Sequence, residues 1–128
     1  MRGRAAFAWA ALLLSAAASA AVTGSFEGSG RACSGRLVVT ATAAAWVTPQ
    51  GRCKRGGYEV LEEGRDPPRA VFRLKHAGRA CRTPVVVLRQ HAAGDPDTGW
   101  EVIGYPSVAA FRADDDASAL SCALVRLK

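Results

Sequence analysis

The sequence predicts an all-β fold, a small antiparallel meander of about eight strands that closes as a barrel or packs as a sandwich. Short apolar or alternating segments recur along the chain, and clusters of glycine, proline and aspartate separate them. Sequential strands with short connections usually pair as antiparallel neighbours. We expect one short helical turn and two disulfides to complete the domain.

The first twenty residues indicate a secretory signal peptide that is cleaved. Arg2 and Arg4 precede an apolar run from Ala5 to Leu14, and small residues ending in Ala18-Ser19-Ala20 follow. A transmembrane helix needs about 20 apolar residues, and this run tapers into alanine and serine before that length. We therefore expect a single β domain over residues 21–128, periplasmic or secreted, that does not span a membrane after cleavage.

The strands follow from alternating or β-branched residues. In chain order they are expected at Phe26–Ala32, Leu37–Thr42, Trp46–Thr48, Gly57–Glu63, Arg69–His76, Thr83–His91, Trp100–Tyr105 and Leu120–Leu127. Pro106-Ser107 opens the short helix, and Asp114 to Asp116 begin an exposed loop. The aromatic residues on these strands are expected in the core: Trp46, Tyr58, Phe72 and Trp100.

Four cysteines follow the signal peptide, and an even number in an exported chain of this size indicates a disulfide framework. The favoured pairing is Cys33–Cys53 and Cys81–Cys122, with a crossed pairing left open. It depends on a hairpin about Ala43 whose opposed pairs share one face: Val39 and Val47, Leu37 and Pro49, Cys33 and Cys53. The cysteine spacing predicts no metal site, and no motif predicts a cofactor.

The expected mature domain is modestly basic. Removal of Arg2 and Arg4 leaves 15 basic residues against 11 acidic ones, a formal charge of +4. The basic residues are spread from Arg31 to Lys128, whereas nucleic-acid binding favours one concentrated surface with aromatic platforms. We therefore expect no nucleic-acid partner.

Residues that could perform catalysis or bind a metal are few. His76 and His91 end consecutive strands, and antiparallel pairing of those strands would place them at opposite ends, which argues against a shared site. Ser107 lacks the nucleophile-elbow motif. Asp95 and Asp97 offer oxygen ligands, but the closing glutamate of a calcium loop is absent, so we expect a turn and no metal site.

These observations favour a small exported, non-enzymatic binding module, of the protein-binding or inhibitor type, that uses loops at one end of the scaffold. One candidate contact loop is Gln50 to Gly57, which exposes basic residues to an acidic partner: Arg52, Lys54 and Arg55. The other is Asp95 to Thr98, with Asp95 and Asp97. Two alternatives stay open, a small barrel that carries an apolar ligand inside and a hydrolase of unknown substrate.

Overall fold

The computed structural model describes residues 22–91 and 95–128, which form a single nine-stranded antiparallel sheet. The expected signal peptide lies outside the described residues. The strands are β1 (Gly24–Gly28), β2 (Gly35–Val39), β3 (Ala44–Thr48), β4 (Gly51–Gly56), β5 (Tyr58–Arg65), β6 (Pro68–Leu74), β7 (Val85–Gln90), β8 (Trp100–Tyr105) and β9 (Leu120–Leu127).

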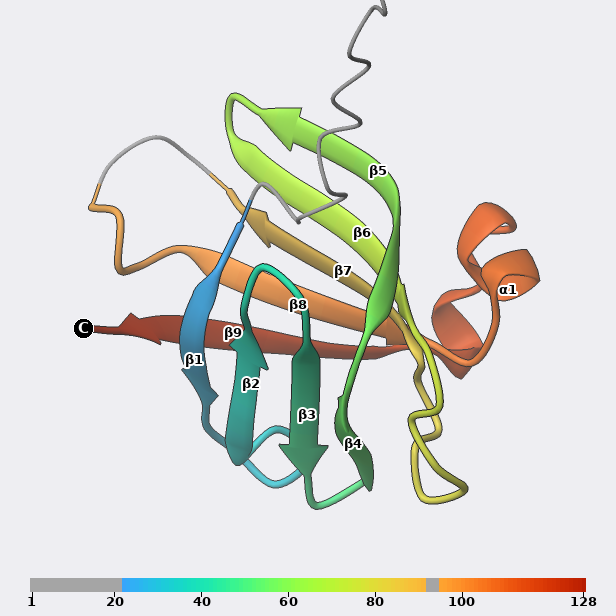
Figure 1. The fold of residues 1–128 in the computed structure, drawn as a ribbon. Helices are drawn as coiled ribbons and strands as arrows, with labels where there is room; N and C mark the ends of the chain where they lie inside the picture. Colours follow the sequence, from blue (N-terminus) through green and yellow to red (C-terminus); the bar gives the residue numbers. More distant parts are fainter. Residues whose placement is uncertain (1–21, 92–94) are drawn as a thin grey trace, which may run out of the picture.

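The sheet closes on itself because its two edge strands are consecutive in the chain. The strand order is β4-β3-β2-β1-β9-β8-β7-β6-β5, and only Gly57 separates β4 from β5. These two strands form one long bent strand whose first half pairs with β3 and whose second half pairs with β6. The predicted all-β meander is confirmed, and its strands form a nearly closed barrel (Figure 1).

The antiparallel pairing gives the barrel two distinct ends. The connections β1–β2, β3–β4, β6–β7 and β8–β9 lie at one end, which we call the β3–β4 end. The connections β2–β3, β5–β6 and β7–β8 lie at the other, which we call the β7–β8 end. Residues on the same end therefore come from segments that are far apart in the sequence.

Large side chains fill the barrel interior. Phe26, Leu37, Phe72 and Leu88 are fully buried and belong to one cluster with the other expected core aromatics, Trp46, Tyr58 and Trp100. Alternation along the strands selects these residues, because every second side chain points inward. The expected aromatic core is confirmed.

A second apolar cluster lies outside the barrel, where helix α1 (Val108–Arg112) covers β6, β7 and β8. The Ser107 hydroxyl accepts a hydrogen bond from Ala110 N at 3.0 Å and so caps the helix. Val85 and Val87 face this cluster while Val86 faces the interior. Burial on both faces explains why β7 is a continuous apolar run. Within the described part of the chain, no helix is long and apolar enough to cross a membrane.

The favoured disulfide pairing is wrong, because the bridges join Cys33 to Cys122 and Cys53 to Cys81. The predicted hairpin placed its turn too late in the chain. Thr40 Oγ1 accepts a hydrogen bond from Ala43 N at 3.0 Å, and this capped turn pairs Val39 with Ala44 and Leu37 with Trp46. The change in register moves Cys33 away from Cys53.

A second turn, at Pro49 and Gln50, follows β3, and β4 begins at Gly51. The predicted loop from Gln50 to Gly57 is therefore mostly a strand. In the β3–β4 ladder, Cys53 lies opposite Trp46. From β4, Cys53 reaches Cys81 in the β6–β7 connection. The two bridges thus tie chain connections to strands of the barrel.

The two bridges should contribute unequally to stability. Cys33 and Cys122 are separated by 89 residues and Cys53 and Cys81 by 28, for which loop-closure entropy gives about 4.6 and about 3.6 kcal/mol. Each bridge joins one buried and one half-buried cysteine, so the packing losses are similar. In urea unfolding, Cys33→Ala/Cys122→Ala should lose about 1 kcal/mol more than Cys53→Ala/Cys81→Ala. Recovery of a Cys33–Cys53 peptide from the unreduced wild type would contradict the pairing.

Tyr105 gives the outer cluster a pH-dependent stability. Burial and the hydrogen bond that its hydroxyl donates to Asp114 Oδ1 at 3.2 Å raise the pKa of Tyr105. Because the folded-state pKa exceeds the unfolded value, the contribution is complete below about pH 10 and is lost as the pH rises through the folded-state pKa. Urea unfolding should be measured between about pH 8 and pH 11 for wild type and Tyr105→Phe. The free energy of unfolding of wild type should fall relative to that of the variant only above about pH 10. A constant difference would contradict this expectation.

Candidate functional site

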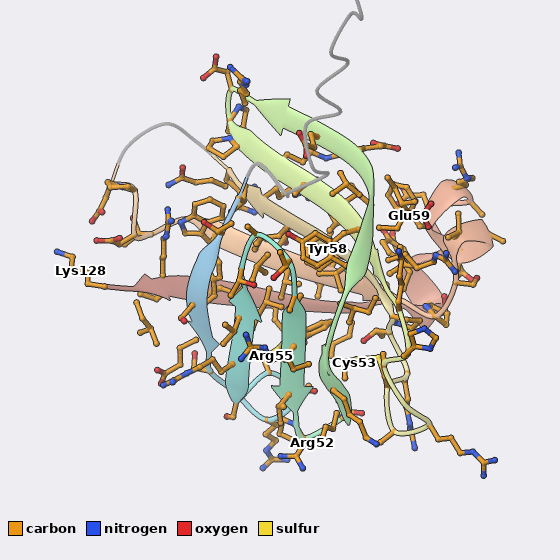
Figure 2. The ribbon with its side chains drawn as sticks, in the orientation of Figure 1. Arg52, Cys53, Arg55, Tyr58, Glu59 and Lys128 are labelled. Atoms are coloured by element: carbon orange, nitrogen blue, oxygen red, sulfur yellow. A yellow bond between two sulfur atoms is a disulfide. The ribbon has the colours of Figure 1, made fainter. Side chains whose placement is uncertain are left out.

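The predicted contact residues lie in two separate places. Arg52, Lys54 and Arg55 are exposed on β4. Figure 2 labels Arg52 and Arg55 on either side of Cys53 in the chain. Asp95 and Asp97 lie in the β7–β8 connection, at the opposite end of the barrel from the β3–β4 turn that precedes Arg52. The two predicted sets therefore do not form one surface.

The aspartates of the β7–β8 connection form a turn that is tied to the barrel. Asp95 Oδ1 accepts a hydrogen bond from Asp97 N at 2.9 Å. The buried Gln90 side chain donates to the carbonyls of Asp95 and Thr98 at 2.8 and 2.9 Å. The Asp97 carboxylate lies 3.6 Å from Lys128 Nζ. The expected turn is confirmed, and internal contacts already engage much of its polar surface.

A concentrated group of basic side chains surrounds the Cys53–Cys81 bridge. Residues 49–57 and 75–84 contain no acidic residue and carry a formal charge of +6, compared with +4 for the whole expected mature chain. All six side chains are exposed, and we call them the basic surface: Arg52, Lys54, Arg55, Lys75, Arg79 and Arg82. The spread of basic residues along the sequence hides this concentration, because the fold brings two distant segments together.

Backbone contacts hold the two basic segments side by side. Arg52 N donates to the Ala80 carbonyl and Lys54 N to the Ala77 carbonyl, both at 3.0 Å. A Cβ atom at Gly51 would lie 2.7 Å from the Ala80 oxygen, so this close approach requires glycine. The β6–β7 connection thereby covers the outer edge of β4. The basic side chains, and not unpaired backbone groups of a strand edge, are what the solvent meets here.

No side chain of the basic surface forms an ion pair with another described residue. Among residues 22–91 and 95–128, the ion pairs of arginine and lysine involve Arg36, Arg69, Arg73, Arg89 and Lys128, and none involves the basic surface. The flanks of the bridged cysteines, "GRCKR" and "GRACR", contain the signal from which the surface could have been predicted. Using that signal required the correct disulfide pairing.

A pocket of about 200 Å³ opens at the β3–β4 end next to the basic surface. Its lining includes the buried residues Trp46 and Cys53 and the exposed residues Gln50, Arg82 and Ser118. The lining comes from β3, β4 and the turn between them, from the β6–β7 connection, and from the short 3-10 helix Asp116–Ser118 with the start of β9. The pocket thus combines an apolar base with a polar mouth.

Several donors at this pocket are available to a ligand. The side chains of Gln50, Arg82 and Thr83 make no hydrogen bond or ion pair within the described parts of the chain. Ser118 differs, because its hydroxyl donates to the Asp115 carbonyl at 3.1 Å. The free donors can therefore bind an acceptor such as a carboxylate.

The histidines and the serine near them do not have the arrangement of a catalytic nucleophile hydrogen-bonded to a histidine base. The β6–β7 register places His76 and His91 at opposite ends of the barrel, as expected. His91 Nε2 lies 3.4 Å from Glu101 Oε1, and the Ser121 hydroxyl donates to Glu101 Oε2 at 3.3 Å. The carboxylate stands between serine and histidine, whereas a catalytic triad needs histidine in the middle. Within residues 22–91 and 95–128, no group of three or more potential ligand side chains could hold a metal ion.

Gly104 packs closely against two residues that line the pocket, Trp46 and Thr83. A Cβ atom there would lie 2.5 Å from Trp46 Cζ3 and 2.6 Å from Thr83 Cβ. Gly104→Ala should therefore lower the free energy of unfolding by about 1–3 kcal/mol through overpacking, measured by urea denaturation. Gly64→Ala is the matched control, because its new Cβ would meet Arg69 Cβ at 3.8 Å, an ordinary contact. Equal stability of the two variants would show that Trp46 and Thr83 are not held against Gly104.

No family model, no curated protein and no solved structure matches this chain. The charge and geometry of the basic surface and its pocket are the features of the molecule that bear on its function.

Proposed function

We propose that the chain is a small exported, non-enzymatic binding module that holds an acidic region of a partner protein against the basic surface. The observation that carries the proposal is the gathering of six exposed basic side chains, without an acidic residue, in two segments joined by Cys53–Cys81. Like charges gathered on one surface repel each other and oppose folding. A partner of opposite charge would relieve this repulsion and would associate faster because of it.

The rigidity of the basic surface supports the same proposal. Arg52 and Lys54 lie on a strand that is hydrogen-bonded on both sides, to β3 and to the β6–β7 connection. The disulfide adds a covalent link between the two segments. A surface that is already ordered loses less conformational entropy on binding than a mobile loop does.

Apolar groups next to the charges suit a protein partner. Ala45 and the exposed Val47 lie with Arg52 and Arg55 along a shallow groove on the outer face of β3 and β4. Protein interfaces combine apolar contact with arginine at their centre, whereas a surface for small ions needs no such apolar area. Side chains fill the barrel interior, which favours a binding site on the outside.

The disulfides support an oxidising location for this binding. Both bridges of the structure involve cysteines of the expected mature chain, and such bridges persist in the periplasm or outside the cell. Together with the predicted signal peptide, this supports a partner in the envelope or the extracellular space.

The proposal predicts a partner whose binding depends on the basic surface. The immobilised wild type should recover it from the exported fraction of the host, and Arg52→Glu/Arg82→Glu should bind it at least tenfold more weakly, because two attractive charges become repulsive. The dissociation constant, measured by calorimetry, should also rise with sodium chloride concentration.

The matched control is Arg65→Glu/Arg112→Glu, which changes the net charge equally at exposed arginines outside the basic surface. This variant should bind the partner nearly as well as wild type. If both variants weakened partner binding equally, the net charge of the protein would account for the loss, and the proposal would be contradicted. Recovery of no partner at concentrations well above micromolar would also contradict it.

A further inference from the structure

The pocket beside the basic surface has the size of one side chain. Its volume is about 200 Å³. Pockets for drug-sized ligands measure about 300–1,000 Å³. The volume therefore favours a side chain presented by a partner over a larger free ligand.

The lining selects the chemistry of that side chain. Trp46 and Leu120 give the pocket apolar walls, which suit a methylene stem. Gln50, Arg82 and Thr83 provide donors that have no partner among the described residues, which suit a carboxylate. A guanidinium can bind a carboxylate through two parallel hydrogen bonds. Of the acidic side chains, glutamate has the longer stem.

The charges around the pocket are unevenly distributed and would orient the bound group. Arg82 belongs to the basic surface on the β6–β7 side. On the β8–β9 side, Ala117 and Ser118 line the pocket and directly follow Asp115 and Asp116. A carboxylate would be repelled from the aspartate side and attracted toward Arg82.

We infer that this pocket accepts one glutamate side chain of the acidic partner, with its carboxylate at Arg82 and Thr83 and its stem against Trp46. The inference rests on the proposed function for its partner, but binding of the isolated side chain can be measured without one. The pocket would then hold one glutamate of the partner in a fixed position beside the basic surface and so act as an anchor for the complex.

The direct test uses the full mature chain, isotopically labelled, and two probes that differ only in charge. Acetyl-glutamate methylamide should give saturable amide shifts at Thr83 and Ser118 and at the Trp46 indole, with a dissociation constant of about 1–10 mM. Acetyl-glutamine methylamide, the neutral isostere, should bind at least fivefold more weakly, because it lacks the charge that Arg82 attracts. Equal shifts from both probes, or no saturation by about 50 mM, would overturn the inference.

Two tryptophan variants then separate the pocket from the surrounding charge. Ala117 is exposed and lines the pocket, so Ala117→Trp should occlude it and weaken glutamate-probe binding at least fivefold. Ala113 is also exposed but is not part of the lining, so Ala113→Trp should bind the probe as wild type does. Both variants should keep the wild-type circular dichroism spectrum. Equal probe binding by the two variants would overturn the inference.

The outcomes distinguish this inference from the proposed function. If Arg52→Glu/Arg82→Glu weakens partner binding but Ala117→Trp binds the partner as Ala113→Trp does, the basic surface binds the partner and the pocket inference fails. If the glutamate probe binds in the pocket and no partner is recovered, the pocket recognises glutamate and the proposed function fails.

Discussion

The closure of the barrel through the bent strand β4–β5 is the constraint on which the rest of the structure depends. At Gly57 the chain leaves its pairing with β3 and begins its pairing with β6. The Tyr58 hydroxyl donates to the Thr40 carbonyl at 2.6 Å, and Lys75 N donates to the Gly57 carbonyl at 2.9 Å. These contacts fasten the β4–β5 junction to the β2–β3 and β6–β7 connections, and the closed sheet surrounds the aromatic core.

The same closure creates the candidate site. Because β5 pairs with β6, the connection that follows β6 is brought against the outer edge of β4. Its carbonyls satisfy the amides of Arg52 and Lys54, and Cys81 meets Cys53. Two basic segments about twenty residues apart in the sequence thus become one surface. The pocket forms where this surface meets the start of β9.

The alternation of apolar and polar residues predicts which face of a strand is buried, but it does not determine the register between neighbouring strands. It predicts β5, β6, β8 and β9 and the buried run of β7, whereas Pro106-Ser107 predicts the helix. It could not locate the turn that Thr40 caps, because a side-chain hydrogen bond decides that position. The first hairpin therefore shifted by an odd number of residues, which reverses the faces of a strand. The predicted disulfide pairing is wrong for the same reason, and the predicted contact loop therefore contains only three residues of the basic surface: Arg52, Lys54 and Arg55.

The distribution of carboxylates explains why the basic surface differs from the rest of the barrel. Arg36, Arg73 and Arg89 each stand opposite a glutamate on the neighbouring strand and pair with it: Glu27, Glu59 and Glu101. Cross-strand pairs of opposite charge stabilise a sheet, and like charges destabilise it. Cross-strand ion pairs thus neutralise several arginines of the sheet, and among residues 22–91 and 95–128 no such pair forms around Cys53–Cys81. Under the proposed function, the acidic partner supplies the opposite charge that the surface itself lacks.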